Sequence, residues 1–176
     1  MGRNEKLIKS GKVVFPDGVR EVSLYIRDQR IAAVLDKGED APAGCEIIDA
    51  DGKMVMPGMI DTHNHMCDPG PYRYREDWSC GTKSAASGGI TTICDMPLPC
   101  EPETVNEENF RIKEKAASDQ AVVDYAFWGG MIPSNISEMQ KLYELGCKYC
   151  PVGMFSFRMQ TQEACCYADH RGNTGA

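Results

Sequence analysis

Two histidines, His63 and His65, stand two residues apart directly after an apolar segment and close behind Asp61. In an extended strand, residues i and i+2 point to the same side, so both imidazoles can face one metal ion. Imidazole suits zinc and its neighbours among the divalent metals, and a nearby carboxylate can orient a ligating histidine. A chance pair on the surface is the alternative. The chain has only three histidines, so we favour a metal site.

The segments around this pair alternate between strand-like and helix-like patterns. The patterns predict strands at 58–61, 90–94, 122–128 and 147–152, and they predict helices at 77–86, 104–117 and 137–145. We expect Asp77 to cap the first helix and capping boxes at 104–107 and 137–140 to open the other two. This order implies a parallel sheet, in which the first strand is buried and polar residues gather at the carboxyl ends of the strands.

The residues before this region have a different character. Short alternating segments predict strands at 6–14, 22–26, 31–35, 46–50 and 53–56. Turns are expected at 16–18 and at Asp28-Gln29, and Asp51-Gly52 predicts a hairpin between the last two strands. Residues 1–57 therefore form an all-β module, and residues 158–176 show neither period.

Five segments together resemble the allantoinase branch of the cyclic amidohydrolases, the superfamily of dihydroorotase, hydantoinase and allantoinase. They are residues 57–65, 76–78, 81–92, 95–98 and 123–130, and the resemblance covers about residues 5–155. It implies an α/β fold, with a small β-sandwich at 1–57 followed by the first part of a metal-dependent (β/α)8 barrel at 58–157. The truncated barrel is then followed by an irregular tail at 158–176, which is either disordered or the product of a frameshift.

The resemblance also implies a site with two divalent metals, zinc in the first place and manganese or cobalt as alternatives. His63 and His65 match the ligands of the first barrel strand, and Lys148 matches the carboxylated lysine that bridges the metals. A solvent-facing Lys148 is the alternative. Further histidines and a catalytic aspartate come from later strands in the family. We therefore expect the chain alone to bind at most one metal weakly and to lack activity.

Two positions bear on the substrate that the resemblance implies, which is allantoin, hydrolysed to allantoate. Cys67 stands where dihydroorotases have an arginine that grips a carboxylate, and where allantoinases have asparagine. Pro99 stands at a second substrate-contact position, where the family has asparagine. A hydantoinase or dihydropyrimidinase and a scaffold that has lost its chemistry are the alternative interpretations.

Composition narrows the possible partners. The net charge of −7 and the scattered basic residues argue against a nucleic-acid-binding surface.

The sequence has no apolar run of membrane-spanning length and no signal peptide, so a cytoplasmic location is expected. Nine cysteines, an odd number, argue against a disulfide framework, and most should be buried. The partner expected is a small cyclic ureide, and family members are commonly homo-oligomers.

Overall fold

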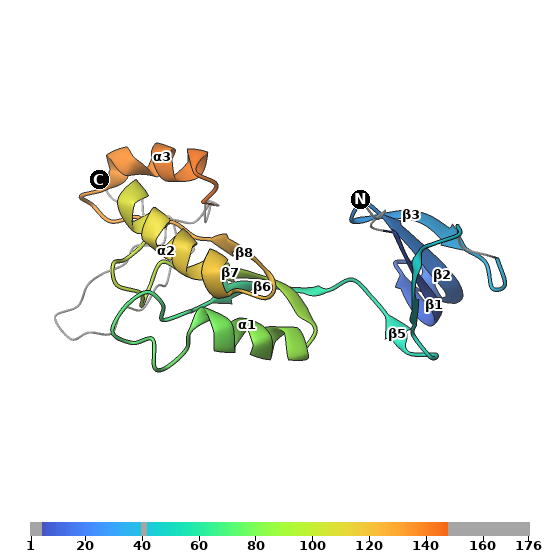
Figure 1. The fold of residues 1–176 in the computed structure, drawn as a ribbon. Helices are drawn as coiled ribbons and strands as arrows, with labels where there is room; N and C mark the ends of the chain where they lie inside the picture. Colours follow the sequence, from blue (N-terminus) through green and yellow to red (C-terminus); the bar gives the residue numbers. More distant parts are fainter. Residues whose placement is uncertain (1–4, 40–41, 148–176) are drawn as a thin grey trace. The chain divides into compact units, whose positions relative to one another are not determined.

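The computed structural model describes residues 5–39 and 42–147 (Figure 1). The chain divides into two compact units, of which the first is Met1–Pro57 and the second begins at Gly58. In the described residues, the secondary-structure elements of the first unit are all strands, and the second unit combines a parallel sheet with helices. The predicted α/β class is confirmed.

The first unit is built on one five-stranded sheet. Its strands are β1 (Glu5–Phe15), β2 (Gly18–Arg27), β3 (Arg30–Leu35), β4 (Glu46–Asp49) and β5 (Met54–Val55). The first three form an antiparallel meander, because tight turns join them. Asp28 and Gln29 both adopt positive φ, as the predicted turn requires. The second layer that a sandwich needs stays a prediction.

The predicted hairpin at Asp51-Gly52 is wrong. The chain does turn there, with positive φ at both residues, but β4 and β5 do not pair with each other. Both strands run parallel to β1, one beside each half of it. The reason is a bulge in β1 at Ser10, whose carbonyl accepts the Gly52 amide at 2.7 Å. The turn follows this bulge and moves the chain from one half of β1 to the other.

The second unit has a three-stranded parallel sheet with helices packed on one face. The strands lie in the order β6 (Met59–Asn64), β7 (Ile90–Asp95) and β8 (Asp124–Phe127), each parallel to the next. The helices are α1 (Trp78–Ser87), α2 (Glu107–Gln120) and α3 (Met139–Glu144), the last preceded by the 3-10 turn η1 (Ile136–Glu138). Buried side chains from the helices meet those from the strands in one core: Trp78, Ile93, Phe110, Phe127 and Leu142. Because the three strands are parallel, their carboxyl ends lie at the same edge of the sheet (Figure 1).

The strand that carries the histidine motif is more exposed than predicted. Met59 is 52% exposed and Ile60 is 62% exposed, although the apolar run indicated a buried strand. Within the described part of the chain, β6 pairs only with β7, so it is an edge strand of its sheet. The core of the unit lies over β7 and β8, where Ile93 and Phe127 are buried.

The helix starts agree with the sequence in one case and depart from it in two. Asp77 caps α1 as predicted, accepting the Cys80 amide at 2.7 Å. The capping box predicted at 104–107 is wrong, because Thr104 is fully buried and Asn106 caps α2 instead. The box predicted at 137–140 is also wrong. Neither η1 nor α3 has a side-chain cap, since the chain enters α3 through a 3-10 turn. The strand predicted at 147–152 lies almost wholly outside the described residues.

The cap of α2 provides a first test. Asn106 Oδ1 accepts the Asn109 amide at 2.9 Å, so Asn106→Ala should lower the free energy of unfolding by about 1 kcal/mol. Asn106→Asp keeps an acceptor at this position and should change little. Urea unfolding followed by tryptophan fluorescence measures both. An aspartate variant that loses as much as the alanine variant would contradict the cap.

Candidate metal centre

The two imidazoles of the motif meet at the carboxyl end of β6. The Nε2 atoms of His63 and His65 lie 3.1 Å apart, with the rings tilted by 57°. Two nitrogens that are each about 2.0–2.1 Å from one zinc ion lie about 3 Å apart when their angle at the metal is between a right angle and tetrahedral. The pair therefore fits two ligands of one divalent metal.

A hydrogen bond of the His65 ring determines which of its two nitrogens carries the proton. His65 Nδ1 lies 2.6 Å from the carbonyl oxygen of Leu98, which can only accept a hydrogen bond. Nδ1 must therefore carry the hydrogen, and the lone pair of the neutral ring is on Nε2, the atom that faces His63. A backbone carbonyl on the Nδ1 of a ligating histidine is a common arrangement in metal sites.

Asp61 has a different role from the one that the sequence suggested. Its carboxylate accepts the backbone amide of His63 at 3.1 Å and the side-chain amide of Asn64 at 3.0 Å. The carboxylate thus stabilises the backbone at the end of β6, whereas the carbonyl of Leu98 orients the ring of His65.

Neighbouring strands hold the backbone of the motif. The indole of Trp128, just after β8, donates to the carbonyl of Thr62 at 2.9 Å. The amide of Met96, just after β7, donates to the carbonyl of Asn64 at 2.8 Å. Sequence reasoning missed both contacts because their partners are 32 or more residues away along the chain. The only signal in the sequence was that Met96 and Trp128 lie at the carboxyl ends of predicted strands.

The other predicted site residues lie in different surroundings or outside the described residues. Cys67 is only 6% exposed, burial raises the pKa of its thiol, and its amide donates to Glu76. Pro99 is half-buried and follows Leu98, the residue that contacts His65. Lys148 lies outside the described residues, as do His170 and the tail at 158–176.

The donor set in the described part of the chain is two histidines. Within residues 5–39 and 42–147, no third histidine, cysteine, aspartate or glutamate joins His63 and His65 in an arrangement that could hold a metal. Two imidazoles leave open coordination positions on a divalent ion, which other ligands or water have to fill.

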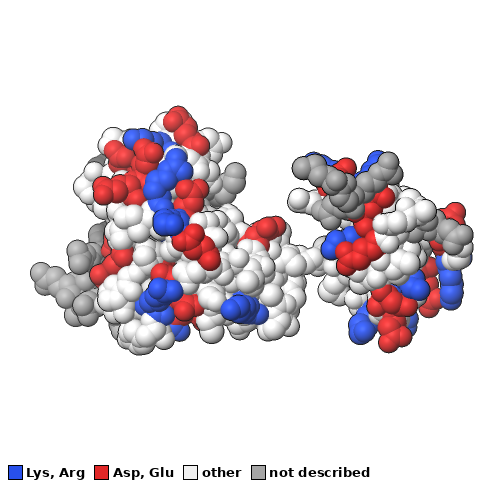
Figure 2. All heavy atoms as spheres, viewed as in Figure 1, with Lys and Arg blue, Asp and Glu red and all other residues white. Residues whose placement is uncertain are grey.

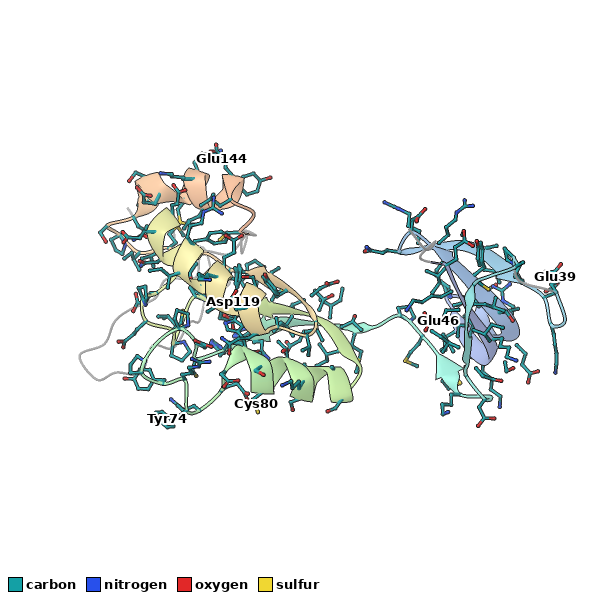
Figure 3. All side chains as sticks on the ribbon, in the orientation of Figure 1. Glu39, Glu46, Tyr74, Cys80, Asp119 and Glu144 are labelled. Carbon is teal, nitrogen blue, oxygen red and sulfur yellow. The ribbon has the colours of Figure 1, made fainter. Side chains whose placement is uncertain are left out.

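The thiols offer a test of the burial around this edge of the sheet. Burial raises the pKa of Cys67 and Cys100, whereas Cys80 lies at the outer surface of α1 (Figure 3). The thiolate is the reactive form, so iodoacetamide at pH 8 should alkylate Cys80 well before Cys67 and Cys100. Peptide mass spectrometry of timed samples measures the rates, with the urea-unfolded chain as control. Equal rates in the folded chain would contradict this placement.

Comparison with known proteins shows which sequences this chain resembles. The profile of the family described as "Amidohydrolase family" matches residues 46–95, which include the histidine motif. An allantoinase from Streptomyces avermitilis is 37% identical over 142 residues, which are 81% of this chain and 32% of that protein. An allantoinase from Bacillus licheniformis is 42% identical over 135 residues, or 75% of this chain and 29% of that protein. The chain is thus similar to part of the allantoinases and, at residues 46–95, to the amidohydrolase family.

The second comparison is with solved structures, in which the chain is similar to hydantoinases. An L-hydantoinase (dihydropyrimidinase) from Arthrobacter aurescens superposes with a TM-score of 0.72 at 35% identity, covering 85% of this chain and 32% of that structure. A D-hydantoinase gives a TM-score of 0.65 at 33% identity, with coverages of 80% and 31%. The chain thus spans about a third of the length of the relatives that it matches. Its resemblance to the N-terminal part of this superfamily is confirmed.

One further observation concerns membranes. Among the helices at residues 5–39 and 42–147, none is both long enough and apolar enough to cross a bilayer.

Proposed function

We propose that this chain provides the first metal-binding strand of a divalent-metal-dependent cyclic amidohydrolase whose substrate is allantoin. The observation that carries the proposal is the pair of Nε2 atoms of His63 and His65, 3.1 Å apart at the carboxyl end of β6. Relatives named allantoinase, 37–42% identical to this chain, support the choice of substrate. Zinc is the metal proposed, with manganese and cobalt as alternatives.

The chemistry assigned to the site is hydrolysis of a ring C–N bond. A divalent metal supplies Lewis acidity and an activated water for attack on the amide carbonyl. In this chain, Nε2 of His63 and Nε2 of His65 hold the metal, and the Leu98 carbonyl keeps the proton of His65 on Nδ1. Lys148, the proposed carboxylated bridging ligand, stays part of the proposal.

Substrate choice rests on the residue that follows the motif by two positions. A buried Cys67 offers no charge for gripping a substrate carboxylate, so dihydroorotate is disfavoured. Hydantoin is the second candidate, because the L-hydantoinase structure superposes well on this chain. Acidic and basic side chains are interspersed on the part of the surface that Figure 2 shows. The net charge of −7 argues against a nucleic acid as the partner, and a small cyclic ureide is the partner proposed. A cytoplasmic location and association into homo-oligomers complete the proposal.

Two chimeras test this proposal. In one, this chain replaces the matching segment of the Streptomyces avermitilis allantoinase; in the other, it replaces that of the Arthrobacter aurescens L-hydantoinase. The allantoinase chimera, loaded with zinc, should open allantoin, and its His63→Ala/His65→Ala version should not. The matched control is Lys115→Met, which alters an exposed ion pair on α2 and should leave turnover intact.

The outcomes separate the candidates. Turnover of hydantoin by the second chimera, with an inactive but folded and metal-loaded first chimera, would replace allantoin by hydantoin as the substrate. Two folded chimeras that bind no metal would favour the non-catalytic scaffold. In either case the metal content and the fold are measured before the activity.

A further inference from the structure

Asp95, the last residue of β7, is a fully buried carboxylate with both oxygens engaged. Oδ1 accepts the backbone amide of Met66 at 2.6 Å, and Oδ2 lies against the ammonium group of Lys113. Both side chains are 0% exposed. Burial raises the pKa of the Asp95 carboxyl, and the charge of Lys113 works against this rise.

Lys113 connects α2 to the end of β7. Besides its ion pair with Asp95, its Nζ donates to the carbonyl of Met96 at 2.5 Å. The ammonium group also lies 5.6 Å from the centroid of the Phe127 ring on β8. These contacts hold the carboxylate of Asp95 in one orientation, with Oδ1 toward Met66.

The contact with Met66 is significant because Met66 directly follows His65. The backbone on the other side of the ring is fixed at Asn64, whose carbonyl accepts the Met96 amide. The bond from Met66 to Asp95 fixes the backbone after the ring. The backbone on both sides of His65 is therefore fixed, by Asp95 at the end of β7 and by Met96 directly after β7. The hydrogen bond to Leu98 then sets the rotation of the imidazole.

A contribution to the free energy of unfolding does not by itself explain the buried ion pair of Asp95 and Lys113. A buried ion pair pays a large desolvation cost, and well-packed apolar side chains in its place are often neutral or stabilising. An apolar side chain at position 95 cannot accept the Met66 amide. An apolar pair would thus lose the hydrogen bond from the Met66 amide to Asp95, next to the motif, and the hydrogen bond from Lys113 to the Met96 carbonyl.

We propose that Asp95 is a positioning residue, held in place by Lys113, that aims His65 at the metal through the Met66 amide. The inference rests on the metal site proposed above. Partners that orient a ligating histidine are worth about 10–100-fold in metal affinity, and the same range is expected here.

Two double variants isolate the effect. Asp95→Asn/Lys113→Met removes both charges but keeps a carbonyl oxygen for the Met66 amide, whereas Asp95→Leu/Lys113→Met removes the charges and the acceptor. Zinc titrations of the full chain are followed through the NMR signals of the imidazoles. The asparagine variant should bind within about threefold of the wild type, and the leucine variant about 10–100-fold more weakly.

Measurements without metal keep this test separate from the metal site itself. In the leucine variant, the Met66 amide should exchange faster with solvent, and ¹H–¹⁵N spectra should show His65 losing its single Nδ1–H tautomer. The asparagine variant should keep both properties. If the leucine variant does not fold, as judged by Trp78 fluorescence, Asp95→Ala/Lys113→Met replaces it.

The outcomes are distinct. A wild-type chain that binds no zinc would overturn the metal site, and the exchange and tautomer data would still decide the role of Asp95. Folded variants with equal Met66 exchange, equal tautomers and equal zinc affinity would overturn the positioning role.

Discussion

Lys113→Met is expected to lower the free energy of unfolding of the second unit by about 3–5 kcal/mol, because it leaves the buried carboxylate of Asp95 without its counter-charge. Met96 also loses the donor to its carbonyl. Both tryptophans of the chain, Trp78 and Trp128, belong to this unit, so the fluorescence change on urea unfolding reports on it alone.

The loss should depend on pH in one direction. Burial raises the pKa of Asp95, and removing Lys113 takes away the charge that opposes this rise. An acid whose folded pKa is raised contributes its stability below the unfolded value, about 3.9, and loses it as the pH increases. The variant should therefore be less impaired at pH 5 than at pH 8.

A matched substitution on the same helix controls for helix propensity and for loss of a lysine. Lys115 pairs with Asp119 on the exposed side of α2, where Asp119 is labelled in Figure 3. Lys115→Met should change the unfolding free energy little, because exposed ion pairs contribute little. Equal losses for the two variants would contradict a special role for the buried pair.

The second large effect concerns the metal. His63→Ala or His65→Ala should weaken zinc binding by more than the factor of about 10–100 expected for loss of an orienting partner, because each substitution removes a ligand itself. The two Nε2 atoms lie 3.1 Å apart, so each ring needs the other to hold the same ion. Zinc-dependent shifts of the remaining imidazole in NMR titrations measure the effect.

The third histidine of the chain is the control. We expect His170→Ala to bind zinc like the wild type, since His63 and His65 are the two histidine ligands of the proposed site. An alanine at position 63 that left the zinc-dependent shifts of His65 unchanged would show that the two rings do not share an ion.

Local patterns predicted the features that depend on neighbouring residues. The spacing of His63 and His65 gave their convergence, because the side chains alternate along an extended segment. Asp77 was recognisable as a helix cap from its position before the helical run. The alternation of strands and helices likewise indicated a parallel sheet with polar residues at the ends of its strands.

Features that depend on distant residues were not predictable in this way. Asp51-Gly52 is a turn, but the bulge at Ser10 in β1 decides where the strands on either side of it pair. Thr104 has the residue type of a cap but is buried, and Asn106 takes the role. Lys113 reads as an ordinary charged residue of a helix, and only its contact with Asp95 shows why it is buried.

The most direct test of the metal site is X-ray absorption spectroscopy of the chain with one equivalent of zinc. Nine cysteines offer competing ligands, so zinc binding alone does not identify the site. We predict imidazole nitrogens at about 2.0–2.1 Å from zinc, lost in the His63→Ala/His65→Ala variant. A spectrum dominated by sulfur at about 2.3 Å and unchanged in that variant would contradict a metal centre at His63 and His65.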